Sequence, residues 1–198
     1  MTTTVVTGQH GQIAYQMTLP VFSGPETDLV NVRVRRSADE GLTASTRDVP
    51  ADVVGNIDAT GHVSVNDGRT VQVLLPFRYY AQGAAHPTDT VATVALRRAD
   101  AQPVLLTDIF SDSTAALTVA LQHASEVAAA QGQDNPASTL TTKVSDWSNW
   151  QSSPTGITFS FDDYAAGSHA AGLRSVEVPW TLLRPYVRDD AYRLLGPR

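Results

Sequence analysis

Residues 62–81 restrict the fold more than any other part of the sequence. Two runs rich in β-branched and aromatic residues, "HVSV" and "TVQVLLPFRYYA", flank the tetrapeptide "NDGR". Asp-Gly between such runs is among the strongest short signals for a tight hairpin turn. The pattern therefore predicts an antiparallel β-hairpin and commits this part of the chain to a sheet.

The sequence from residue 112 to residue 131 changes to a helical period. Its apolar residues recur three and four positions apart, a stripe that one helix can turn toward a sheet: Leu117, Ala120, Leu121, Ala124, Val127 and Ala128. A polar residue at 111–113 can cap the start, and Gly132 can end the helix. We expect this helix to be the longest, with Leu117, Leu121, Ala124 and Val127 buried.

Residues 25–42 allow two interpretations. Val30, Val32 and Val34 alternate as in a strand, but Val30 and Val34 also fit a helical stripe. Pro25 suits a first helical turn, and the acidic residues after it complement the positive end of a helix dipole. These features favour a second, shorter helix in the N-terminal part.

Further strand-like runs lie on both sides of these segments: "QIAYQMTLPVF", "DTVATVALRR", "PVLL", "ITFSFDDY" and "LRSVEVPW". Strands, a helix and strands again, joined by tight turns, favour an α+β fold with antiparallel sheets. The length of 198 residues suits one domain spanning 1–198.

Charge and composition exclude several classes of protein. The net charge is −6, and the arginines are scattered rather than gathered in a basic stripe that could follow a phosphate backbone. We therefore expect no nucleic-acid partner. The first residues lack the charged and apolar regions of a signal peptide. The chain is therefore either cytosolic or an exported domain without its leader or anchor. Without cysteine it has no disulfides, thiol catalysis or thiolate metal sites.

Three motifs occur in the order and spacing of a bacterial envelope family. They are "YYAQGAAHP", "PVLLTDIFSDSTAALTVAL" and "GITFSFDDYAAGSHAAGLRSVEVPWTLL". The matching positions are Tyr79, Tyr80, Gly83, Ala85 and His86; Leu106, Asp108, Ile109 and Phe110; and Phe161, Tyr164, Gly172, Val176, Val178 and Pro179. Over about 77–187, and more loosely over 1–76, the chain resembles the C-terminal extracytoplasmic domain of lysozyme-sensing anti-sigma factors. It is also similar to small secreted mycobacterial immunogenic proteins.

The resemblance implies an exported domain that binds a protein partner, such as a lysozyme or another envelope component. We expect a monomer without cofactor or metal, since the five histidines form no close ligand pair. The predicted ligand-binding residues are His86, His169, Tyr79, Tyr80 and Tyr164. They lie in or beside two loops of small residues, which we expect to approach each other. Ala84 departs from the family's Gly-Gly turn.

A secreted hydrolase, acting on an ester or a cell-wall bond, is the alternative. Its candidate residues are Ser168, His169 and His86, with a carboxylate from Asp108, Asp162 or Asp163. Against it, "AAGSHAAG" lacks the G-x-S-x-G nucleophile elbow, and Asp108 lies where a carboxylate caps a helix.

Two tryptophans also allow two interpretations. Trp147 and Trp150 stand three residues apart in "SDWSNW" and suit either a stacking platform for sugars or core packing. We expect core packing for Trp150, while Trp147 is left open.

Overall fold

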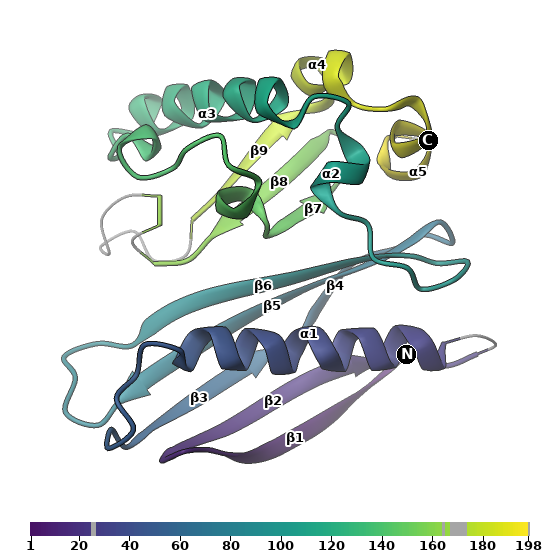
Figure 1. Cartoon of the computed structure of the whole chain (residues 1–198). Coiled ribbons are helices and arrows are strands. Elements are labelled where there is room, and N and C mark those ends of the chain that lie inside the picture. Colours follow the sequence, from purple (N-terminus) through teal and green to yellow (C-terminus); the bar gives the residue numbers. More distant parts are fainter. Residues whose placement is uncertain (25–26, 164, 167–173, 198) are drawn as a thin grey trace.

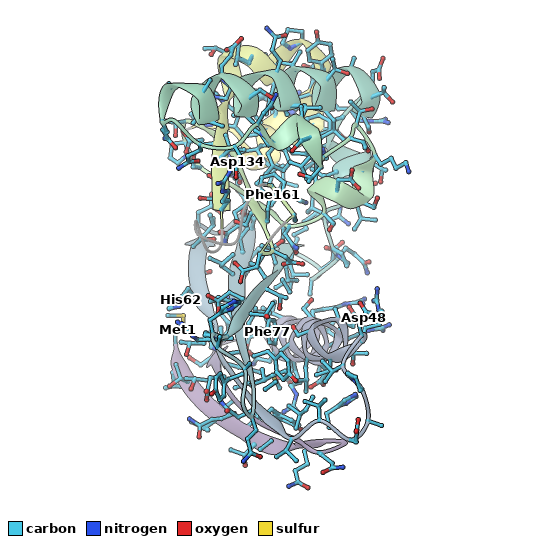
Figure 2. All side chains as sticks on the ribbon, turned by 90° about the vertical axis from the view of Figure 1, so that its left-hand side faces the viewer. Met1, Asp48, His62, Phe77, Asp134 and Phe161 are labelled. Atoms are coloured by element: carbon cyan, nitrogen blue, oxygen red, sulfur yellow. The ribbon has the colours of Figure 1, made fainter. Side chains whose placement is uncertain are left out.

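The computed structural model describes residues 1–24, 27–163, 165–166 and 174–197. The chain forms two lobes, each a sheet covered by one long helix (Figure 1). Each lobe has its own hydrophobic core: Phe77 belongs to the N-terminal core and Phe161 to the C-terminal core (Figure 2). Strand β6 (Thr88–Arg97) contributes to both cores, because Leu96 packs in the N-terminal core and Ala95 in the C-terminal core. That the whole chain is one domain stays a prediction.

The N-terminal lobe contains a six-stranded sheet. Its elements are β1 (Thr2–His10), β2 (Ile13–Val21), helix α1 (Asp28–Thr46), β3 (Gly55–Thr60), β4 (His62–Asn66), β5 (Thr70–Ala81) and β6. The long β5 pairs with β3, β4 and β6. The predicted hairpin is β4–β5, and Gly68 in its turn has φ +85°. All pairs are antiparallel except β2–β3, which are parallel because α1 carries the chain back between them.

Helix α1 is longer than the sequence suggested. It has 19 residues against 18 for α3 (Ser113–Ala130), so the expectation of a shorter N-terminal helix is wrong. Val30, Val34, Ala38 and Leu42 form a buried stripe, which confirms the helical interpretation over the strand. The helix continues through Gly41 because the ring of Phe77 packs there, where an added Cβ would lie 2.5 Å from the ring.

The C-terminal lobe is a three-stranded antiparallel sheet in the order β7-β8-β9. Its elements are α2 (Leu106–Ile109), α3, the 3-10 turns η1 (Pro136–Ser138) and η2 (Val144–Trp147), β7 (Trp150–Ser152), β8 (Gly156–Phe161), β9 (Arg174–Pro179), α4 (Trp180–Leu183), η4 (Arg184–Tyr186) and α5 (Asp189–Leu195). The α+β class with antiparallel sheets is therefore confirmed, and the two sheets carry two long helices rather than one.

Helix α3 lies slightly rotated from its predicted orientation. Ala116, Leu117, Ala120, Ala124 and Ala128 are buried, whereas Leu121 and Val127 are only partly buried. The alanines at the centre of the stripe let the helix approach the sheet closely, and the larger residues flank them. As predicted, Asp112 caps the start, its side chain accepting a hydrogen bond from the amide of Ala115.

Two local assignments needed the structure. "PVLL" is not a strand, because it makes only an isolated bridge between Pro103 and Leu96 before α2 begins. Strand β1 was not recognised at all, since most of its side chains are exposed and no alternation of buried and exposed residues marks it. No helix in the described part of the chain is long and apolar enough to cross a membrane.

Candidate functional site

The predicted tyrosines lie on opposite sides of β5. Tyr79 is half-buried against the N-terminal core, and its hydroxyl is buried without a hydrogen-bond partner among the described residues. Loss of solvent there raises the pKa of Tyr79. Tyr80 is 40% exposed. Only Tyr80 of this pair therefore presents a substantial surface to a partner.

His86 lies in the exposed turn between β5 and β6. Its Nδ1 is 3.1 Å from the carbonyl oxygen of Pro87. The positive φ of this turn is at Gly83, with φ +87°, and not at Ala84, so the departure from a Gly-Gly pair causes no strain. Tyr80 and residues 82–87 are called the hairpin end below. The predicted residues Tyr164 and His169, and the candidate nucleophile Ser168, lie outside the described residues.

The carboxylates named for a hydrolase accept hydrogen bonds from the backbone. Asp163 accepts a hydrogen bond from the amide of Asp89 at 2.8 Å, and Asp162 accepts one from Val91 at 2.7 Å. Asp108 accepts one from Leu105 at 3.0 Å and so caps α2. The bond to Asp89 brings the start of the loop after β8 close to the hairpin end. Each of these carboxylates therefore helps to hold the backbone in place.

The pKa of Asp162 is raised. Burial is the main cause, and the charge of Asp163 adds to it, while the hydrogen bond from Val91 works in the opposite direction. Between the ordinary aspartate pKa and this raised value, the folded protein holds a proton that the unfolded chain has lost. The free energy of unfolding therefore falls as pH rises through this window.

Replacing Asp162 with asparagine tests this effect. The amide oxygen can still accept the hydrogen bond from Val91, but no charge is buried beside Asp163. We expect the Asp162→Asn variant to gain stability relative to the wild type as pH rises from acidic to neutral, measured by urea denaturation at each pH. Asp162→Ala, which removes the acceptor, is the control for the lost hydrogen bond. A difference between wild type and Asp162→Asn that does not change with pH would contradict the assignment.

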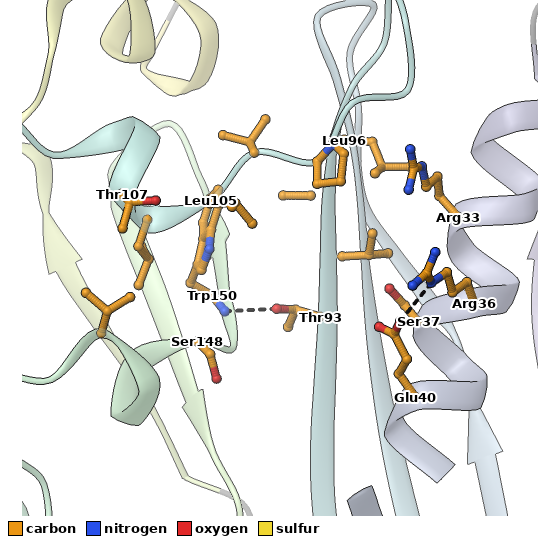
Figure 3. Close-up of a pocket in the computed structure, with 16 residues that line it drawn as sticks. Arg33, Arg36, Ser37, Glu40, Thr93, Leu96, Leu105, Thr107, Ser148 and Trp150 are labelled. Carbon is orange, nitrogen blue, oxygen red and sulfur yellow. Dashed lines mark hydrogen bonds and ion pairs between the residues drawn. The ribbon is translucent and has the colours of Figure 1, made fainter. Parts of the chain in front are cut away.

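A groove of about 530 Å³ lies between the lobes. Arg33 and Arg36 of α1 lie on one side, Leu105 and Trp150 on the other, and β6 runs between them (Figure 3). Leu105 is 56% exposed at the rim. We call this pocket the inter-lobe groove.

The inter-lobe groove combines apolar and basic side chains. Arg36 pairs with Glu40 at 2.8 Å, while Arg33 has no acidic partner in the part of the chain that the structure describes. The described lining includes no histidine or aspartate, and its one carboxylate is already paired. An apolar wall thus lies beside a guanidinium that has no acidic partner among the described residues.

Sequence reasoning missed the groove, because its walls come from segments far apart in the chain. Trp150 lines it while being 4% exposed, so the prediction of core packing for Trp150 is confirmed. Trp147 is fully buried, and a sugar-stacking role for it is therefore wrong. No group of three or more histidine or acidic side chains among the described residues is placed to hold a metal ion.

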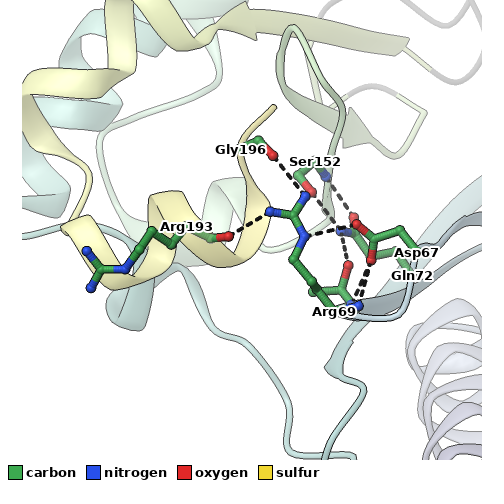
Figure 4. A network of polar contacts seen from close by, with 7 residues as sticks. Asp67, Arg69, Gln72, Ser152, Arg193 and Gly196 are labelled. Atoms are coloured by element: carbon green, nitrogen blue, oxygen red, sulfur yellow. Dashed lines mark hydrogen bonds and ion pairs between the residues drawn. The ribbon is translucent and has the colours of Figure 1, made fainter. Parts of the chain in front are cut away.

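Polar contacts fix the two lobes around the groove. The buried amide of Gln72 donates to the hydroxyl of Ser152 and accepts from its backbone amide, both at 2.7 Å. Arg69 donates to the carbonyl oxygens of Arg193 and Gly196, at 2.6 and 3.0 Å (Figure 4).

Burial alone would raise the pKa of Asp67, but hydrogen bonds from Thr70 and Arg69 hold this pKa below its ordinary value.

Comparison with known proteins places the fold. Residues 107–181 match the model of DUF3298, a family described as a protein of unknown function. A comparison with curated proteins finds no match. The chain is similar to a DUF3298 family protein from Pseudomonas aeruginosa PAO1, with TM-score 0.66 and 13% identity over 96% of this chain and 95% of that one. A DUF3298 family member from Bacteroides fragilis NCTC 9343 gives TM-score 0.62 and 13% identity over 94% and 92%. At this identity the likeness establishes the fold alone.

Proposed function

We propose that this chain is an exported binding domain that recognises a protein of the cell envelope, with the inter-lobe groove as its main contact. The groove carries the proposal, because it combines an apolar wall, a guanidinium without an acidic partner among the described residues, and no acid-base pair in its described lining. The motifs shared with the extracytoplasmic domain of lysozyme-sensing anti-sigma factors support export and make a secreted lysozyme the first candidate partner.

The hairpin end is the second proposed contact. Tyr80 and His86 are exposed there on the rigid β5–β6 pair, and exposed loops on rigid scaffolds commonly carry binding residues. His169 and Tyr164 belong to this proposed surface through the sequence motif.

The experiment measures binding of the folded chain to a secreted lysozyme by calorimetry, beside a pull-down from cell-envelope extract. Leu105→Asp puts a charge on the apolar wall, and we expect it to weaken binding about tenfold or more. The matched control is Leu182→Asp, at a leucine that is 39% exposed outside the groove, and it should bind like the wild type. His86→Ala should cost about 1–2 kcal/mol of binding, with His62→Ala, another exposed histidine, unchanged.

The outcomes separate the alternatives. Equal binding by Leu105→Asp and its control would exclude the groove as the contact. Absence of any stoichiometric protein partner would contradict the binding function. Turnover of a generic ester, lost in Ser168→Ala or His169→Ala, would favour the hydrolase instead.

A further inference from the structure

Strand β1 forms one margin of the six-stranded sheet, and its outer side pairs with no strand in the described part of the chain. Its register with β2 runs from Thr2↔Val21 to His10↔Ile13. Because only two residues connect the strands, His10 and Ile13 must be a hydrogen-bonded pair, and every second residue of β1 bonds to β2. The N–H and C=O groups of Thr3, Val5, Thr7 and Gln9 therefore point away from the sheet.

Strand β6 lies on the other side of β5 from β3 and β4, and its outward amides are bonded. The outward amides of Asp89, Val91 and Thr93 in β6 donate to the side chains of Asp163, Asp162 and Asn149. Further along β6, the segment 102–104 bonds to its backbone: Arg97 donates to the carbonyl of Gln102, and Val104 donates to that of Ala95. The outward amides of β6 are thus bonded, whereas those of β1 bond to no described residue.

Strand β1 also lacks the features that keep sheet edges from pairing. Charged side chains, prolines and bulges are the usual means. Residues 1–25 contain no Asp, Glu, Lys or Arg, and β1 contains no proline. Its register with β2 has no shift. Threonine and valine, which favour extended backbone, make up most of the strand.

We propose that β1 pairs antiparallel with β1 of a second copy of this chain. With Val5 opposite Thr7 of the second copy, every outward residue of one strand meets an outward residue of the other, and the pair has two-fold symmetry. Val6 of each copy then faces Val6 of the other. The net charge of −6 comes wholly from residues beyond 25, so two copies meet on uncharged strands despite their like charge.

A single strand pair buries less surface than a stable dimer interface needs, so the dimer is weak and forms at high concentration. Sedimentation velocity from micromolar to millimolar protein is expected to show a rise from 21.2 kDa toward twice that mass. Val5→Lys places a charge on the edge, and Thr7→Pro removes an outward amide while keeping the pairing with β2. Each is expected to weaken self-association at least tenfold.

The control is Val54→Lys, at a valine that is 47% exposed outside β1, and it should associate like the wild type. Circular dichroism confirms folding of each variant, and Thr7→Pro keeps the test valid if Val5→Lys does not fold. A wild-type chain that stays monomeric at millimolar concentration, as the sequence alone suggests, overturns the proposal. So does a dimer that both β1 variants leave intact.

Discussion

Replacing Trp147 with alanine is expected to destabilise the protein by about 3–5 kcal/mol, the range for removing a fully buried large aromatic side chain. Its ring meets Phe159 and Phe161 edge to face, with centroids 5.0 and 5.4 Å away. Its Nε1 donates to the carbonyl oxygen of Thr141 at 2.7 Å. The substitution leaves a cavity in the C-terminal core and an acceptor without its donor.

Urea denaturation followed by circular dichroism measures this loss. Trp147→Phe is the matched variant, because it keeps an aromatic ring against Phe159 and loses mainly the hydrogen bond to Thr141; we expect it to cost less than the alanine variant. A loss below about 1 kcal/mol in Trp147→Ala, the average cost of any substitution, would show that the indole is not a core residue.

Replacing Gln72 with alanine is expected to cost about 1–3 kcal/mol for the unsatisfied amide of Ser152 alone, with the lost side-chain packing in addition. Gln72 is fully buried, and both ends of its side-chain amide bond to Ser152 in the other lobe. A buried group that loses its partner has no water to replace it. We expect the same change to weaken the contact between the lobes.

The neighbouring bridge supplies the control. Gln151 donates to the hydroxyl of Ser64 and also joins the lobes, but this contact is exposed, so water can replace it in Gln151→Ala. Urea denaturation of both variants should show the larger loss for Gln72→Ala. Equal losses would mean that burial does not decide the strength of the lobe contacts.

Local patterns in the sequence predicted most elements of the fold. The Asp-Gly hairpin and the α3 stripe are encoded within short windows, so they were recoverable from residues alone. Strand β1 was not, because it is held by backbone pairing to β2 and carries almost no buried side chains. The prediction of a strand at "PVLL" was wrong, because this segment makes only one bridge to β6 and then leads into α2.

The candidate site was predicted less completely. Tyr80 and His86 are exposed, which agrees with a role at a surface, whereas Tyr79 is directed to the core. The inter-lobe groove joins Arg33 to Leu105 and Trp150. Such a juxtaposition depends on how two lobes pack, and no periodicity along the chain encodes it. Asp162 and Asp163 show the same limit, since their partners lie more than seventy positions away.

The closed margin of β6 also determines how far the protein can assemble. Copies that pair through β1 cannot also add a strand at β6, because the outward amides of that strand are already bonded. The side chains of Asp162, Asp163 and Asn149 thus block the addition of a strand at β6. They do so only while the C-terminal lobe stays in place. We therefore expect that detaching that lobe, while the first sheet remains folded, would free the outward amides of β6 for pairing with a further strand.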